Sequence, residues 1–439
     1  MALFIRRNGQ SYKIRLPYRI PSPDSPIVPL PLPEKVILPF YNTNASYSIL
    51  VKRGDKILGG QKIVDSDDFS ITPIHTTISG EVSGIIKLIE PASGRPVDAI
   101  AITSDGEDKW IEETPKNPEA LSVKEIVTAI REAGITEGVD TLPAHLKLTK
   151  PEGKGIEAII LNGCQCEPYL TSNARLLLEN GEQVFSGLKI INRALPNAII
   201  YIVIDNDRYD VIDNVEKMVK ASGFENIKIV LLEKKYPAVA ETSLVKTVLG
   251  IDIPANGMAA DIGVAVFDIA TAKAIHDAVN FGKPFIEKVI TIAGSVNQPM
   301  NLLVRIGTPL RNLIDYCGGI KGEADEAIMN GLMMGVPLYE LDFPVTKGLG
   351  SIVIGKSNPL KEQDCIRCGK CLDVCPACLV PSLLTTYAKA GRYDDCKENY
   401  IDSCFECGAC AYICPSNIPL VQYIRIAKVE LDKRAAVKQ

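Results

Sequence analysis

Ten of the thirteen cysteines of this chain lie between positions 365 and 414, in two runs that share one spacing. Residues 365–376 and residues 404–415 both read C-x2-C-x2-C-x3-C-P. Three thiolates spaced in this way can wrap around one face of a four-iron cube, while the fourth points away and ligates a neighbouring cube. The spacing therefore predicts a pair of [4Fe–4S] clusters, whose chemistry is one-electron transfer.

Crossed ligation assigns the fourth cysteine of each run to the cluster of the other run. Cys378 and Cys396 stand outside the pattern and are interpreted as buried thiols. Zinc is a poor alternative, because zinc sites favour two C-x2-C pairs across a longer gap. A purely structural iron–sulfur site is a second alternative. The predicted ligand sets are Cys365, Cys368, Cys371 and Cys414 for cluster 1, and Cys404, Cys407, Cys410 and Cys375 for cluster 2.

Gly369 and Gly408 occupy the same place in the two runs. We expect the backbone to pass close to inorganic sulfide there, with no Cβ in the way. Between the runs, residues 379–390 have a helical pattern that ends near Gly391. One helix is therefore predicted to separate the two halves of the array.

Composition limits what else the chain can do. Its 439 residues suggest about three folding units, and a net charge of −5 is too close to neutral for a broad nucleic-acid-binding surface. No apolar run approaches the roughly 18 residues of a membrane-spanning helix, and no export signal is present. We therefore expect metal ligands rather than disulfides, no nucleic-acid partner, and attachment to a membrane only through other subunits.

The elements that must position the cysteines follow from periodicity and from glycine and proline content. Strands and helices alternate in the centre of the chain, which predicts an open, largely parallel α/β sheet. The predicted segments are 1–45, a proline-rich extended strap; 46–114, a β unit that resembles a barrel-sandwich (lipoyl-like) domain; 115–280, the α/β unit; 281–350, a second β-rich unit; 351–423, the cysteine array; and 424–439, a charged helical tail.

Further motifs accompany the array. Residues 162–169 read NGCQCEPY, residues 254–263 read PANGMAADIG, and residues 331–335 (GLMMG) are followed by PVTKG at 344–348. In this order, and over essentially its whole length, the chain resembles the C subunit of the Rnf electron-transport complex. The cysteine array alone is shared with many ferredoxin-like proteins, whereas the combination is specific.

The resemblance implies a fold and a place of action. It implies a central domain like the flavin- and NADH-binding subunit of respiratory complex I, a β-grasp ligand-binding unit at 281–350, and a two-cluster ferredoxin-like domain. It also implies a peripheral subunit on the cytoplasmic side of the membrane, which works with other Rnf membrane subunits and couples ferredoxin oxidation to ion pumping. If FMN is retained, the residues that would hold it are Lys147, Asn162 and Glu167; no catalytic residue is assigned.

The chain departs from that family where nucleotides would bind. Family members that use NADH have a glycine-rich loop before a Phe-Pro-Thr-His-Val-Lys-like segment, whereas residues 134–147 read GITEGVDTLPAHLK. Glu137 and Asp140 bring negative charge to the place of a phosphate. Gln165 stands where the family has a carboxylate, and Asn173 where it usually has Asp. We therefore predict a degenerate site, with FMN doubtful and NAD(H) not used.

Basic residues surround the first cysteine run: Lys356, Lys361, Arg367 and Lys370, against Glu362 and Asp364. This surplus suggests docking of an acidic, ferredoxin-like electron carrier, although an ordinary solvated face is an equal alternative. Two other functions stay open: a soluble flavo-iron–sulfur reductase that feeds a corrinoid or amino-acid reductase system, and a scaffold braced by its clusters.

Overall fold

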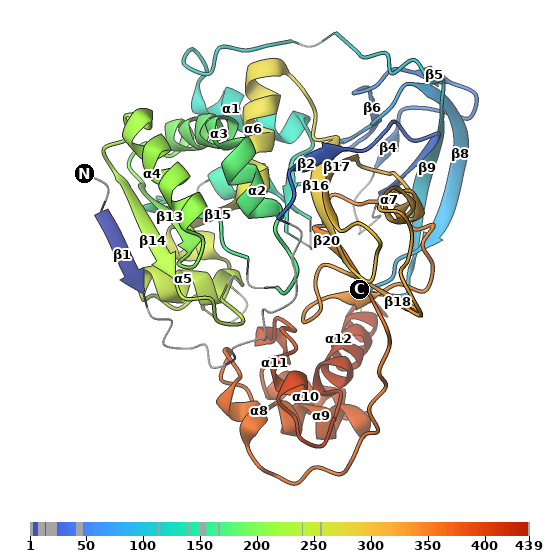
Figure 1. The fold of residues 1–439 in the computed structure, drawn as a ribbon, viewed down its shortest axis with the longest axis vertical. Helices are drawn as coiled ribbons and strands as arrows, with labels where there is room; N and C mark the ends of the chain where they lie inside the picture. The colour runs from blue at the N-terminus through green and yellow to red at the C-terminus, as the bar shows by residue number, and fades with distance from the viewer. Residues whose placement is uncertain are drawn as a thin grey trace.

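The computed structural model describes residues 3–7, 14, 24–40, 47–112, 114–138, 141–149, 155–165, 167–238, 240–254 and 257–437. Asp140 of the predicted nucleotide loop and Cys166 lie outside the described residues. The α/β unit and the β units lie side by side, and the cysteine-rich helices lie below them (Figure 1). No helix among the described residues is both long and apolar enough to cross a bilayer.

The central unit is a five-stranded sheet in the order β1-β14-β13-β12-β15, with all neighbouring strands parallel. Alternate residues of each strand pack on opposite faces, so Ile159 faces α1–α4 and α6 while Ile160 faces α5. The predicted α/β sheet is confirmed. Its elements are β1 (Leu3–Arg7), α1 (Val123–Glu132), β12 (Ala158–Asn162), α2 (Ser172–Glu179), α3 (Gly181–Ala194), β13 (Ile199–Asp205), α4 (Tyr209–Ser222), β14 (Ile227–Leu232), α5 (Glu241–Leu249), β15 (Val264–Asp268) and α6 (Ile269–Phe281).

Two antiparallel sheets form the barrel-sandwich unit, in the orders β3-β9-β8-β5 and β4-β6-β7. Their inward side chains, such as Val36, Ile63 and Ile100, are fully buried. The strands are β3 (Lys35–Phe40), β4 (Ser48–Ile49), β5 (Lys56–Ile57), β6 (Lys62–Asp65), β7 (Ile74–His75), β8 (Gly80–Ile89) and β9 (Pro96–Ser104).

The second β-rich unit is a six-stranded sheet in the order β19-β18-β20-β16-β17-β2. Its elements are β2 (Ile27–Pro29), β16 (Glu287–Gly294), β17 (Met300–Arg305), α7 (Leu310–Tyr316), β18 (Glu326–Met329), β19 (Val336–Pro337) and β20 (Ser351–Gly355). The predicted boundary at residue 350 is therefore wrong, because β20 pairs with β16 and β18 inside this sheet. The sequence of β20, a short apolar strand just before the cysteines, does not indicate which strands it pairs with.

The described part of residues 1–45 contains three strands rather than a single extended strap. The described strands within them join three different sheets: β1 pairs with β14, β2 with β17 and β3 with β9. The predicted boundary at residue 46 thus cuts the barrel-sandwich sheet. Partners more than fifty residues away leave no periodic signal in the strand itself, so local pattern reading finds extended chain and misses the pairing.

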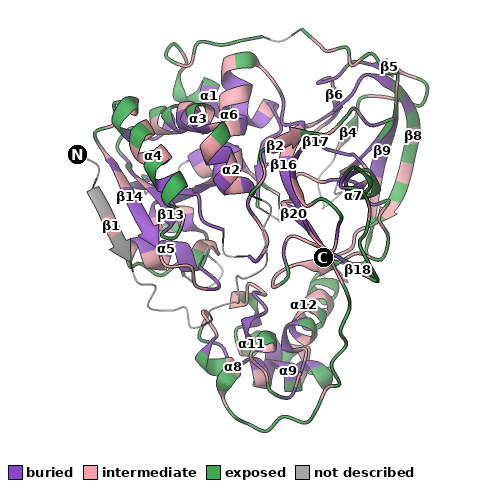
Figure 2. Cartoon of the chain, viewed as in Figure 1, coloured by how far each residue is buried: buried purple, intermediate pink, exposed green. Residues whose placement is uncertain are grey.

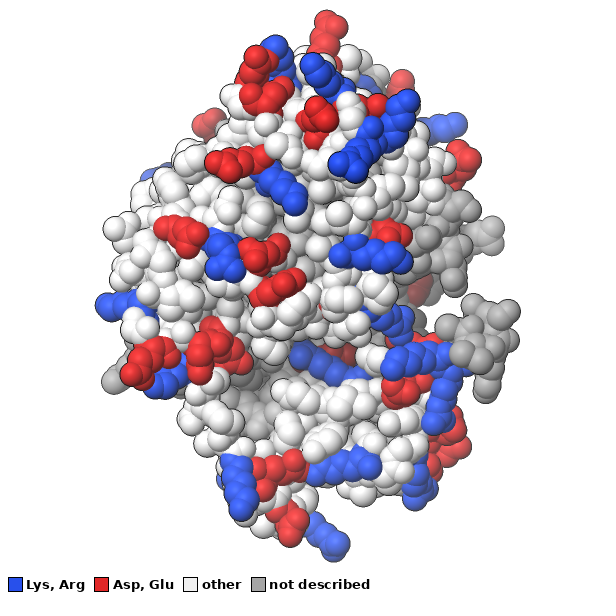
Figure 3. Space-filling view, turned by 90° about the vertical axis from the view of Figure 1, so that its right-hand side faces the viewer, with Lys and Arg blue, Asp and Glu red and all other residues white. Residues whose placement is uncertain are grey.

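The cysteine array lies among α8 (Lys370–Asp373), α9 (Pro381–Lys389), α10 (Tyr393–Glu398), α11 (Ala409–Tyr412) and α12 (Leu420–Val437). The predicted tail begins at residue 424, but α12 begins at Leu420 and buries Val421, Ile424 and Ala427. Ile424 and Ala427 pack with Leu384 of α9, so this helix is part of the domain core (Figure 2). On the face shown in Figure 3, acidic and basic side chains are interspersed over the described residues.

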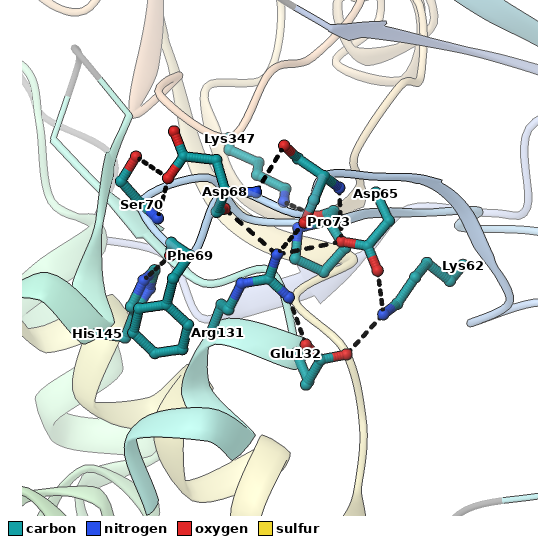
Figure 4. A network of polar contacts seen from close by, with 11 residues as sticks. Lys62, Asp65, Asp68, Phe69, Ser70, Pro73, Arg131, Glu132, His145 and Lys347 are labelled. Carbon is teal, nitrogen blue, oxygen red and sulfur yellow. Dashed lines mark hydrogen bonds and ion pairs between the residues drawn. The ribbon is translucent and has the colours of Figure 1, made fainter. Parts of the chain in front are cut away.

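The barrel-sandwich and α/β units meet in a polar network at the end of α1 (Figure 4). Arg131, which is 7% exposed, donates to the Ser66 carbonyl at 2.6 Å. Lys347, from the loop before β20, donates to the carbonyls of Gly134 at 2.6 Å and Pro73 at 3.4 Å. These contacts from two neighbouring units fix the start of the predicted nucleotide loop.

Candidate functional site

The two cysteine runs have the same backbone conformation. Each contains two residues in the left-handed region, and a third lies two residues after its proline; each run also includes a four-residue helix, α8 or α11. The repeat in sequence is therefore a repeat in three dimensions. The corresponding residues are Arg367 (φ 56°) with Glu406 (57°), Gly369 (77°) with Gly408 (74°), and Cys378 (54°) with Asn417 (52°).

The cysteines predicted to hold cluster 2 lie near one another in a largely dry place. Cys407 and Cys410 are 9% and 8% exposed. Burial raises the pKa of the Cys404, Cys407 and Cys410 thiols, and Cys375 raises each of these pKa values further. Cys375, from the first run, also packs against the same apolar group as Cys404 of the second run.

The cysteines predicted to hold cluster 1 are more open to solvent. Cys365 and Cys368 are exposed. Cys371 and Cys414 pack around the same small apolar group, Cys410, Ile418 and Leu420, so the fourth cysteine of the second run and the third of the first run lie against one group. The first run is thus the outer loop, and the second is the inner one.

The two remaining cysteines of the array differ. Cys396 is fully buried, with its Sγ 3.5 Å from the Leu384 carbonyl, as the sequence predicts. Cys378 is exposed, so its interpretation as a buried thiol is wrong. Its left-handed turn directly after Cys375-Pro376 directs it outward, a geometry that spacing alone does not reveal.

The types of side chain present show whether these loops suit iron–sulfur clusters. Among the described residues, no three His, Cys, Asp or Glu side chains are arranged to hold a single metal ion. A four-iron cube instead spreads its thiolates over separate corners. Two matching loops of soft thiols, one of them shielded from water, suit such a group.

The inner loop packs closely against residues 331–335, which precede the cysteine array. A Cβ on Gly408 would lie 2.4 Å from the Met333 carbonyl oxygen, whereas a Cβ on Gly369 would meet nothing within 4 Å. Gly408 is therefore required by a protein contact in addition to its left-handed φ. Arg425 of α12 supports the same segment by donating to the Met334 carbonyl at 2.9 Å.

Glu167, a candidate flavin residue, lies at this junction. Its carboxylate accepts the N–H groups of Met333 and Met334, both at 3.0 Å, and the hydroxyl of Tyr236 at 3.1 Å. Burial raises the pKa of Glu167, and these donors oppose the rise. In this arrangement Glu167 holds the segment whose Met333 carbonyl lies against Gly408 of the inner loop.

Lys147 and Asn162, the other two candidates, do come together, at the carboxyl ends of β12 and β15. Lys147 Nζ donates to the Val266 carbonyl at 2.7 Å, and Asn162 Nδ2 lies 3.5 Å from Asp268 Oδ1. β12 lies between β13 and β15: the chain passes from β12 through β13 to β14 and then crosses back to β15 on the other side of β12. Parallel α/β sheets bind ligands at such a switch point.

A carboxylate of the chain itself fills this crevice. The Glu137 side chain is 5% exposed; one oxygen pairs with Lys147 Nζ at 2.7 Å, and the other accepts the N–H of Asp268 at the start of α6. Burial raises the pKa of Glu137 to about 7, although Lys147 lowers it. A cation and a helix N-terminus form an anion site, and here both contact Glu137.

Gln165 and Asn173, the other two positions at which the chain departs from the family pattern, form hydrogen bonds with nearby residues. The backbone N–H of Gln165 donates to Asp205 at 3.0 Å, and Asn173 Nδ2 donates to the Cys164 carbonyl at 3.4 Å. Sequence reasoning missed Tyr236, which no motif marks. The glycines of 331–335 and Gly408 carried the only signal of the junction, because clustered glycines permit close backbone contact.

The fold and the site define an iron–sulfur protein of electron transport built on the complex I flavin-subunit architecture. Four family descriptions match the chain: the RnfC barrel sandwich hybrid domain over 15–107, the Nuo51 FMN-binding domain over 130–277, the SLBB domain over 289–337 and the 4Fe-4S dicluster domain over 362–418. The predicted multidomain fold class is confirmed by this order.

Full-length relatives identify the family. The C subunit of the proton-translocating ferredoxin:NAD(+) oxidoreductase complex of Clostridium ljungdahlii is 41% identical, over 93% of this chain and 90% of the relative. The C subunit of the ion-translocating oxidoreductase complex of Rhodobacter capsulatus is 37% identical (93% and 80%), and the Na(+)-translocating homologue of Acetobacterium woodii is 35% identical (91% and 91%). The chain belongs to the RnfC family, the C subunits of ion-translocating oxidoreductase complexes.

A solved structure shares the fold. A chain of the NAD+-reducing [NiFe]-hydrogenase in the H2-reduced state aligns with a TM-score of 0.50 and 16% identity. The alignment covers 73% of this chain and 63% of the hydrogenase chain.

Gly408 and Gly369, which occupy equivalent positions in the two loops, provide a matched test of the contact between Gly408 and the Met333 carbonyl. Gly408→Ala should lower the melting temperature and speed proteolytic release of the cysteine domain more than Gly369→Ala. Both lose a left-handed glycine, at a cost of about 1–2 kcal/mol, but only Gly408→Ala meets the Met333 carbonyl. Equal effects in thermal melts and limited proteolysis would contradict the contact.

Proposed function

We propose that this chain relays single electrons through two [4Fe–4S] clusters as the peripheral, cytoplasmic-side subunit of an Rnf-type complex, which couples ferredoxin-linked electron transfer to ion translocation. The observation that carries the proposal is the pair of equivalent cysteine loops, one open to solvent and one enclosed. An electron relay needs one cluster that a carrier can reach from solvent and a second cluster close to it. Other membrane subunits of the complex would hold the chain at the bilayer.

The placement of the two fourth cysteines supports crossed ligation. Cys375 packs against the same apolar group as Cys404 of the inner loop, and Cys414 and Cys371 pack against one group that also contains Cys410. The cluster of the outer loop is then cluster 1, nearest to solvent, and cluster 2 lies against the α/β unit. When bound, the clusters supply one-electron chemistry; the chain supplies thiolates, spacing and exclusion of water.

Ligand variants separate crossed from uncrossed ligation. Cys375→Ser should lose about half of the iron and give the same residual EPR spectrum as Cys407→Ser, because both would remove a ligand of the same four-iron cluster. Cys414→Ser should match Cys368→Ser. Cys396→Ser is the control and should retain all iron. If the Cys375→Ser spectrum matched that of Cys368→Ser, the assignment would be wrong.

We further propose that the chain binds FMN weakly or not at all and does not use NADH itself. Glu137 occupies the anion position that Lys147 and the start of α6 create. Glu241 adds a second carboxylate 3.6 Å from Lys147. A flavin phosphate would have to displace a buried ion pair. This filled crevice also disfavours the soluble flavo-iron–sulfur reductase, whose chemistry requires a flavin.

Removing the Glu137 carboxylate, which pairs with Lys147, should leave an anion site open to a phosphate. In fluorescence titrations Glu137→Gln should bind FMN at least about tenfold more tightly than the native chain, because a like charge at short range costs about 1–4 kcal/mol. The matched control is Glu182→Gln, the same change on the exposed start of α3. Stoichiometric FMN in the anaerobically purified native protein, or no gain in Glu137→Gln, would refute the proposal.

The partner proposed for the outer loop is an acidic, ferredoxin-like one-electron carrier. Three apolar side chains beside the exposed Cys365 and Cys368 face solvent: Leu360, Ile366 and Leu372, at 62%, 67% and 41% exposure. Lys361, Arg367 and Lys370 are exposed around them and form no ion pair with any described residue, whereas Lys356 pairs with Glu323 at 2.6 Å. An apolar centre with a basic rim suits a transient acidic partner.

Charge reversal tests this docking surface. Lys361→Glu, Arg367→Glu and Lys370→Glu together should slow reduction by reduced ferredoxin at low salt at least about tenfold and abolish its salt dependence. Arg367→Glu should not disturb the loop, since Glu406 occupies the equivalent left-handed position. The triple reversal of Lys124, Lys217 and Lys220, on α1 and α4, is the control. Equal rates in both triple variants would exclude the surface.

A further inference from the structure

Tyr236 reaches from the α/β unit to the backbone of the inner cysteine loop. It follows β14 and is fully buried. Its hydroxyl lies 2.6 Å from the Cys407 carbonyl and 3.1 Å from Glu167 Oε1. A hydroxyl has one proton, so Tyr236 divides a single donor between a ligand residue of cluster 2 and a carboxylate. The shorter contact is the one to Cys407.

Glu167 is held on the other side by the segment that also touches Gly408. Its two oxygens accept the N–H groups of Met333 and Met334. A Cβ on Gly331 would lie 2.4 Å from Glu167 Oε2, so the segment can approach only as glycine. The α/β unit thus fixes both the inner loop and a buried negative charge beside it.

The outer loop has no equivalent contacts among the described residues. Cys368, the counterpart of Cys407, is exposed, and nothing lies within 4 Å of a Cβ built on Gly369. Two loops of the same conformation therefore have different surroundings: the inner loop has a buried tyrosine hydroxyl and a buried carboxylate beside it, whereas Cys368 of the outer loop is exposed.

We propose that Tyr236 and Glu167 are positioning residues that set the redox potential of cluster 2 and make it differ from cluster 1. Hydrogen bonds and local charge tune iron–sulfur potentials. A donor near the cluster favours the more negative, reduced state, and a carboxylate disfavours it. The inference rests on the proposed function only in that Cys407 must ligate a cluster.

The test is potentiometric EPR on the full chain at pH 8. Tyr236→Phe should shift the midpoint potential of cluster 2 downward and change its spectrum, while cluster 1 stays unchanged. Glu167→Gln should shift cluster 2 upward, because it removes a negative charge. Tyr339→Phe is the matched control, since Tyr339 also donates to a backbone carbonyl, that of Ile89 at 3.0 Å, far from the cysteines in the chain.

The outcomes separate the possible roles. Opposite shifts of cluster 2 with full iron content support the inference. Unchanged potentials, shifts of the same sign in both variants, or shared shifts in both clusters would overturn it, because a merely structural contact would loosen the loop in either variant. A native chain with only one cluster would instead refute the two-cluster function, and the iron analysis shows this before any variant is made.

Discussion

The placement of the cysteine-rich helices depends on one buried carboxylate. Glu167 is 8% exposed and is stabilised by the N–H groups of Met333 and Met334, which take the place of water. Two glycines permit this approach: Gly331 beside the carboxylate, and Gly408 beside the Met333 carbonyl. The inner cysteine loop is therefore positioned by a charge and by two absent side chains, and every property of the buried cluster site depends on that junction.

A second buried carboxylate closes the crevice of the parallel sheet. Such crevices bind phosphates because helix N-termini and lysines converge there, and here Glu137 contacts both Lys147 and the start of α6. Relatives align over 91–93% of this chain, and a shared fold does not establish which ligand a site binds. Whether this site accepts a flavin is decided by one side chain and the loop that Lys347 and Arg131 hold in place.

Sequence reasoning succeeded where the determinants are local. The cysteine loops, their left-handed glycines and the α/β alternation follow from spacing over a few residues. It failed for β1, β2, β3 and β20, whose partners are distant in the chain. It assigned Glu167 to flavin because a motif names a residue type and leaves its contacts open. Tyr236 could not be found, since a lone tyrosine after a strand has no signature.

Two loops of one conformation in unequal surroundings give the two proposed cluster sites different properties. The outer loop offers exposed thiols and an apolar, basic surface to a diffusing carrier, and the inner loop is enclosed by the α/β unit, Tyr236 and α12. In the relay proposed above, Glu137 takes the anion position beside Lys147, so the proposed electron path stays within the cysteine domain. The surroundings of Cys407 are then the place where the chain would control the energy of the transferred electron.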